Sequence, residues 1–129
     1  MEYNKILKDA LNCIEWNDLI FEVHHINHDR NDNRISNLLL LPKKLHKKYH
    51  LLLRYASCFC DDIIKKDVGI IPKYHIDTIS KLIECKNDMA YLYQEQANFI
   101  DKVNNTYLVS ESDKDTYIMK LQDISDKYN

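Results

Sequence analysis

Hydrophobic and polar positions follow different periods in successive blocks of the first third of the chain. Residues 1–16 carry apolar side chains at helical spacing and predict a helix. Residues 19–26 are rich in β-branched and apolar residues and predict a strand. Residues 27–34 are rich in Asn and Asp, which favour turns because their side chains bond nearby backbone groups. Residues 38–41 are consecutive leucines and predict a second short strand.

The second strand leads directly into a predicted helix. Pro42 fits the first turn of a helix, where the missing N–H costs nothing, so we expect a helix from about Pro42 to Ile64. Its apolar positions are spaced by three or four residues and define a stripe of Leu45, Tyr49, Leu52, Ala56 and Cys60.

Two further helices are expected in the C-terminal half. Residues 73–104 follow a heptad-like rhythm through Ile76, Ile79, Ile83, Ala90, Tyr93, Ala97 and Ile100. Ser110 and Ser112 are candidate N-caps for a last helix over residues 113–128. We expect an antiparallel hairpin whose apolar surface packs on the back of the preceding helix. The alternatives are a homodimer through the leftover seam and a bundle with no partner.

Composition excludes several classes of protein. One Gly and two Pro leave no room for a Gly-rich phosphate loop or a many-stranded barrel, so helix should dominate. No apolar run approaches the ~20 residues of a membrane span, and the N-terminus lacks a signal-peptide core. We therefore expect no membrane contact and a cytoplasmic location.

Charge is unevenly distributed along the chain. The net charge is −2, but residues 20–54 hold seven Lys or Arg against three Asp or Glu. This basic middle suggests an anionic partner, and nucleic acid is the first candidate.

Histidines cluster in the same basic segment. Five of the six fall within residues 24–50. His46 and His50 are four residues apart on the predicted helix, so they share a face and could grip one metal ion. His24 and His25 are adjacent on the predicted strand and point to opposite sides of it. One can therefore join the metal while the other faces a different part of the site.

The arrangement resembles the HNH endonuclease family. It comprises His24-His25-Ile26, then Asn33-Arg34-x-x-Asn37-Leu38, then His46-x-x-x-His50. The helical spacings and the preceding proline are similar to colicin-type DNases, and the loop is similar to phage and mobile-element HNH enzymes. The resemblance covers roughly residues 20–55.

The resemblance implies a fold class and a division of the chain. The class would be α+β and mostly helical, with a small ββα-metal core at residues 20–66. An N-terminal helix at residues 1–19 and a helical hairpin at residues 73–129 would complete the chain. None of the four cysteines forms a CxxC pair, so no structural zinc knuckle is expected and the outer helices must brace the core by packing.

The resemblance also implies residue roles. His24 and His46 would be metal ligands, and His50 would be a third ligand or would contact the scissile phosphate. His25 would be the general base. Asn37 would not touch substrate; its amide would fix the loop that positions His25.

The expected activity is metal-dependent hydrolysis of phosphodiester bonds in nucleic acid, with DNA as the expected substrate. One divalent ion would be needed, Mg²⁺ or Mn²⁺ for turnover, while Zn²⁺ or Ni²⁺ would bind three imidazoles more tightly. The alternative is a catalytically silent HNH-like module that binds nucleic acid or protein. The acidic total charge keeps it open.

Several basic residues are candidates for nucleic-acid binding. Arg54 continues the His46/His50 face and could hold a phosphate. Lys43 and Lys47 belong to a solvated face that would help DNA approach. Arg34 is either a loop residue or a phosphate contact. His28 lies where the family often has Gly and is interpreted as a loop residue.

Overall fold

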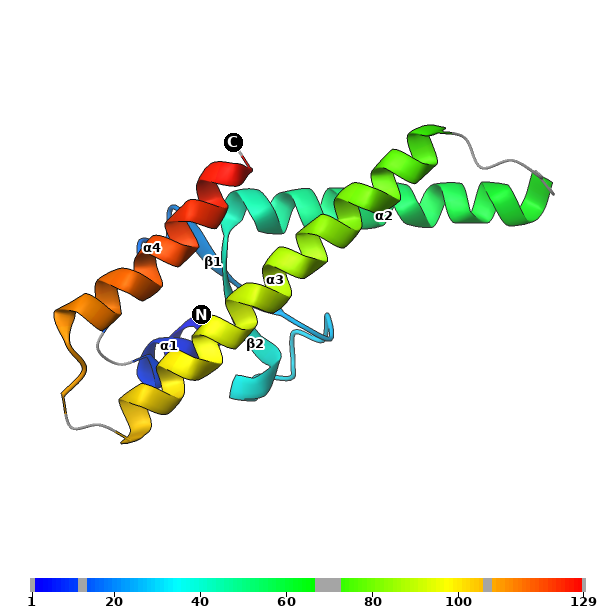
Figure 1. The fold of residues 1–129 in the computed structure, drawn as a ribbon. Coiled ribbons are helices and arrows are strands. Elements are labelled where there is room, and N and C mark those ends of the chain that lie inside the picture. Colours follow the sequence, from blue (N-terminus) through cyan, green and yellow to red (C-terminus); the bar gives the residue numbers. More distant parts are fainter. Residues whose placement is uncertain (1, 12–13, 67–72, 106–107, 129) are drawn as a thin grey trace.

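The computed structural model describes residues 2–11, 14–66, 73–105 and 108–128. The chain is mostly helical, with one small sheet, so the predicted α+β class is confirmed. Its elements in order are α1 (Glu2–Ala10), β1 (Phe21–His25), a 3₁₀ turn (Ile35–Asn37), β2 (Leu38–Pro42), α2 (Lys43–Lys66), α3 (Lys73–Asn105) and α4 (Glu111–Lys127). Figure 1 shows α2 and α3 as the two long helices, with α4 returning toward the start of α2.

The N-terminal helix is shorter than predicted, because α1 ends at Ala10. Ile14 and Trp16 are nevertheless buried, so their apolar character reports burial rather than helix. The ammonium of Lys8 lies 5.1 Å from the centre of the Trp16 ring, which fixes the returning chain against α1. Apolar spacing alone could not separate a helix from the buried residues Ile14 and Trp16 that come after it.

The two strands form an antiparallel ribbon in which His24 is opposite Leu39 and His25 is opposite Leu38. All residues of β2 are buried, because α3 and α4 also contact this strand. Pro42 is the last residue of β2 rather than the first residue of the helix. The Lys43 N–H donates to the carbonyl of Ile20 at 2.8 Å and joins the end of the ribbon to the start of α2.

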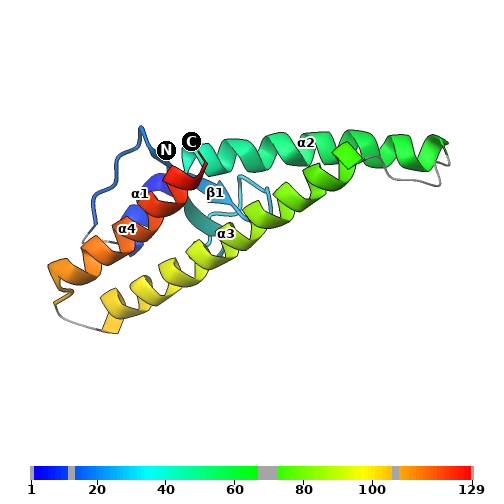
Figure 2. The ribbon, with the colours of Figure 1, turned by 45° about the horizontal axis from the view of Figure 1, so that its top comes forward.

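The apolar stripe of α2 faces the core as predicted. Leu45, Tyr49 and Leu52 are buried and Ala56 is half-buried, whereas the side chain of Cys60 lies outside the described residues. The back of α2 packs on α3, and the two helices diverge where α3 passes the sheet (Figure 2).

The buried face of α3 differs from the predicted one by a single residue. Ile76, Ile79 and Ile83 are 50%, 37% and 54% exposed. The buried positions comprise Thr78, Cys85, Met89, Leu92, Gln96 and Phe99, and all of them except Cys85 lie one residue before a predicted position. One residue corresponds to a rotation of about 100° around a helix. Because Thr78 and Gln96 on this face are polar, a hydrophobicity pattern does not identify the face as buried.

Gln96 explains why a polar side chain lies on the buried face. Its Oε1 accepts the Leu40 N–H at 2.9 Å, and its Nε2 donates to the Leu38 carbonyl at 2.8 Å. These backbone groups point away from β1, so the Gln96 amide takes the place of a third strand. A buried backbone group without a partner is costly, and Gln96 satisfies two of them.

Helix α4 closes the hairpin against α3. The Ser110 hydroxyl accepts the Asp113 N–H at 3.1 Å, which confirms Ser110 rather than Ser112 as the N-cap. The Tyr117 ring stacks on Phe99 at 5.0 Å between centroids. Among the described residues, none of the helices combines the length and apolar character required to cross a membrane.

Candidate metal centre

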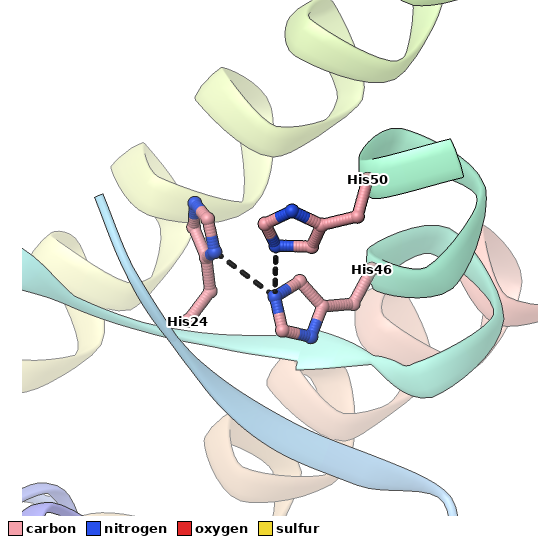
Figure 3. Close-up of side chains that lie close together, drawn as sticks. All are labelled: His24, His46 and His50. Atoms are coloured by element: carbon pink, nitrogen blue, oxygen red, sulfur yellow. Dashed lines mark hydrogen bonds between the residues drawn. The ribbon is translucent and has the colours of Figure 1, made fainter. Parts of the chain in front are cut away.

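Three imidazoles converge between β1 and the first turns of α2. Nδ1 of His24 lies 3.0 Å from Nε2 of His46, and Nε2 of His50 lies 2.9 Å from the same atom. One nitrogen from each ring falls within 4.8 Å of the others, the clustering expected of ligands to a single ion. Figure 3 shows the three rings pointing toward a common centre, His24 from the strand and the other two from the helix.

Local structure accounts for this convergence. His46 and His50 lie one turn apart on the same face of α2. Helix α2 begins immediately after β2, which is paired with β1, so its first turns lie beside the end of the ribbon that carries His24. The i, i+4 spacing on a helix and one histidine on a neighbouring strand are sufficient to build the cluster.

The environment keeps two of these rings, His24 and His50, in the form that binds metal. Burial, followed by the proximity of His46, His50 and other nearby histidines, lowers the pKa of His24 from 6.5 to about 3. Burial followed by the proximity of His46 also lowers the pKa of His50. Neutral imidazoles keep a lone pair for a metal ion, so these shifts favour coordination at neutral pH.

A carboxylate orients one of the three rings. Nδ1 of His46 donates to Oε1 of Glu22 at 2.6 Å, which leaves the lone pair of Nε2 directed at the centre. Sequence reasoning missed Glu22. The signal was present, since Glu22 is two residues before His24 on a strand and so faces the same side.

His25 is buried beside the cluster, and its ring is held by the loop. Its Nε2 donates to Oδ1 of Asn33 at 2.9 Å. Asn33 Oδ1 has no hydrogen to give, so the neutral ring carries its proton on Nε2 and its lone pair on Nδ1. Asn33 therefore selects the tautomer of the residue predicted to be the general base.

Asn37 braces the loop between the strands. Its Oδ1 accepts the Asn27 N–H at 3.0 Å, and its Nδ2 donates to Asn27 Oδ1 and to the Asp32 carbonyl, each at 2.9 Å. The Asn37 side chain is buried, and these hydrogen bonds satisfy both its oxygen and its nitrogen. These contacts match the loop-fixing role that the resemblance implied.

The four basic residues predicted to bind nucleic acid occupy different surroundings. Lys43 lines the pocket at the histidine cluster, whereas Lys47 and Arg54 are exposed on α2 outside its described lining. Arg34 makes a bidentate pair with Asp32, at 2.8 Å from Nε and 2.7 Å from Nη2. These hydrogen bonds lower the pKa of Asp32 to about 2 and favour the loop role for Arg34.

The pocket itself has a volume of about 550 Å³. Its wall carries the three clustered histidines together with His25 and His28. Arg30 and Lys43 supply positive charge, and Asp18 and Glu22 supply negative charge. A polar pocket of mixed charge beside imidazoles suits a metal ion and a charged ligand better than it suits an apolar ligand.

Residues 14–48 match the family model described as HNH endonuclease. The match supports membership of the HNH endonuclease family and confirms the resemblance. It includes His24, His25, Asn37 and His46, and it ends before His50. No curated protein matches the chain, and no solved structure matches it either.

The donor set of His24, His46 and His50 fits a divalent ion. Imidazole nitrogens suit Zn²⁺, Ni²⁺ and related ions, and three protein ligands leave room for a further ligand. Such a ligand would enter through the pocket that His24, His46 and His50 line. The arrangement can hold a metal ion, orient the His25 ring beside it and admit an anionic group.

Proposed function

We propose that the protein is a metal-dependent HNH endonuclease that hydrolyses phosphodiester bonds of nucleic acid, with DNA as the expected substrate. The observation that carries the proposal is the convergence of His24, His46 and His50 beside a buried His25, with all of these except His50 inside the segment that matches the HNH endonuclease model. Metal ligands and a candidate base then share one pocket.

His24, His46 and His50 would hold the ion, which when bound would stabilise negative charge on the phosphate and on the leaving oxygen. Neutral His25, protonated on Nε2 toward Asn33, would take a proton from water at Nδ1. Asn37 would keep the loop, and with it Asn33, in place. Glu22 would hold His46 in the tautomer that binds metal.

The basic residues would guide the substrate. Lys43 and Arg30 border the pocket, so they would lie nearest to the reacting phosphate. Lys47 and Arg54 are exposed along α2 and would contact the backbone farther away. Such contacts supply affinity without reading sequence, which is consistent with the expectation of a phosphate-directed surface.

A cleavage assay tests the proposal. Supercoiled plasmid and a structured RNA are incubated with the full chain in Mg²⁺, Mn²⁺, Ni²⁺ and Zn²⁺. We expect cleavage of DNA with Mg²⁺ or Mn²⁺, and tighter binding of Zn²⁺ or Ni²⁺ by calorimetry. Binding of nucleic acid without cleavage in every metal would instead support the silent HNH-like module.

Substitution of His25 tests the assigned base. His25→Ala should lower the cleavage rate by about 10²–10⁴-fold, because a positioned general base contributes that much, while the Zn²⁺ affinity changes little. His75→Ala is the matched control, since His75 lies on α3 and is not part of the pocket lining described. A His25→Ala protein that retains more than a tenth of the wild-type rate would refute the assignment.

A further inference from the structure

His28 has an unusual backbone conformation next to the histidine cluster. Its φ is 64°, and among the described residues it alone is a non-glycine residue at positive φ. Its N–H donates to the His25 carbonyl at 2.9 Å, so the conformation closes the turn that follows β1. An imidazole-bearing residue pays a steric penalty in this region that glycine would not. Strained residues of this kind gather at functional sites.

The turn brings the His28 ring to the wall of the pocket. Its centroid lies 5.5 Å from the His24 ring and 5.5 Å from the His50 ring. The centroid of the Tyr49 ring lies 6.1 Å from that of His28. The His28 nitrogens are nevertheless outside the group of clustered ligand atoms. His28 therefore lies beside the candidate ligands rather than among them.

The surroundings of His28 suit an anion. Arg30 lines the same pocket, close enough to His50 for its charge to lower the pKa of that histidine. Lys43 lies on the pocket wall as well. A neutral imidazole offers one N–H donor, and hydrogen bonds to charged acceptors are stronger than those between neutral groups.

We infer that His28 is a substrate-binding residue whose imidazole N–H donates to a phosphate oxygen beside the metal, with Arg30 supplying charge to the same group. The inference rests on the proposed function, since it requires a metal in the histidine cluster. A phosphate contact by the ring would explain why this strained position holds a histidine and not a glycine. The chemical class of the ligand is a phosphate mono- or diester.

Phosphate binding to the full chain loaded with Co²⁺ provides a test that does not depend on cleavage. The Co²⁺ affinity is measured first from visible absorption, and inorganic phosphate is then titrated into the loaded protein. We expect His28→Gly to weaken phosphate binding by about tenfold or more, the loss expected for one hydrogen bond to a charged group. The Co²⁺ affinity should stay within about threefold, and the unfolding temperature should be equal or higher because glycine relieves the strain.

Two variants separate the ring from the backbone. Asn31→Gly introduces glycine into the same loop at a position outside the described pocket lining, so phosphate binding should be unchanged. His28→Asn keeps a residue that tolerates positive φ but is too short to reach the pocket, so it should lose phosphate binding as His28→Gly does.

Other results would overturn the inference in distinguishable ways. Unchanged phosphate affinity in His28→Gly or His28→Asn would refute it while leaving the metal centre intact. A tenfold loss of Co²⁺ affinity in these variants would make His28 a ligand instead. Wild-type protein without a Co²⁺ spectrum would refute the proposed metal centre and this inference together.

Discussion

The histidine-bearing segment, residues 21–54, and the hairpin of α3 and α4 differ in how far their polar contacts reach along the chain. Within the segment, Asn37 bonds Asn27 and the Asp32 carbonyl, ten and five residues away. From the hairpin, Gln96 bonds Leu40 and Leu38 across 56 and 58 residues. The site is thus encoded locally, whereas the support for its ribbon comes from a distant helix.

From this difference we expect the segment to depend on the hairpin, even though the cluster of His24, His46 and His50 lies outside the hairpin. The Tyr93 hydroxyl donates to the Ser36 carbonyl at 3.1 Å, directly before Asn37. Leu92, Phe99, Tyr117 and Leu121 belong to the same buried cluster as the leucines of β2. The hairpin therefore packs against β2 and, as the sequence predicted, against α2.

The largest expected effect follows from removing the hairpin. Truncation after Lys66 would expose the β2 leucines and leave two backbone groups of β2 without Gln96. We expect loss of cooperative unfolding in circular dichroism and loss of Co²⁺ binding. A fragment that unfolds cooperatively and binds Co²⁺ like the full chain would show that the predicted division at residues 66 and 73 separates independent units.

A single substitution in α3 sharpens the comparison. Gln96→Leu keeps the side-chain volume but leaves the Leu40 N–H and the Leu38 carbonyl without their partner. We expect a loss of roughly 2–5 kcal/mol in the free energy of unfolding, since each buried unsatisfied group costs about 1–3 kcal/mol. Urea titration measures it. Gln94→Leu, at an exposed position on the same helix, is the control and should change stability by less than about 0.5 kcal/mol. Equal stability of the two variants would contradict the role given to Gln96.

The same contrast explains what the sequence could predict. The two strands, the histidine-bearing helix and the convergence of His24, His46 and His50 follow from spacing within a short segment, because strand and helix periods fix which side chains share a face. The burial of Gln96 does not, because its partners on β2 are too distant in sequence for a local pattern to show. The predicted face of α3, drawn through apolar residues alone, therefore did not include Gln96 and was displaced by one residue.

The loop residues and the residue that orients a metal-binding histidine could be predicted only in part. Asn37 could be assigned through the resemblance, whereas the sequence did not predict the hydrogen bond of Asn33 to His25. Glu22 was two residues from His24 and could have been found from strand alternation alone. Its pairing with His46 required knowing how α2 lies against β1.

Glu22 provides a smaller test, confined to the local region. Glu22→Gln removes the charge that orients His46 while keeping the shape of the side chain. We expect a 10–100-fold loss of Zn²⁺ affinity, the usual range for a partner that orients a metal-binding histidine, with little change in unfolding temperature. Calorimetry measures the affinity. Glu15→Gln, at an exposed position before β1, should bind Zn²⁺ like the wild type. Wild-type affinity in Glu22→Gln would mean that His46 is oriented by packing alone.

The smallest expected effects distinguish two basic residues within the local region, Arg34 and Lys43. Lys43 lines the pocket, whereas the Arg34 guanidinium is paired through Nε and Nη2 with Asp32. A phosphate contact releases counterions, so its loss lowers the salt dependence of nucleic-acid binding by about one unit of slope. We therefore expect Lys43→Gln to reduce the slope of log affinity against log salt by about one, and Arg34→Gln to leave it unchanged. Fluorescence anisotropy with a labelled duplex in Ca²⁺, over a series of salt concentrations, measures both. A reduced slope in Arg34→Gln would show that its exposed guanidinium binds phosphate in addition to Asp32, and the loop would then belong to the nucleic-acid surface.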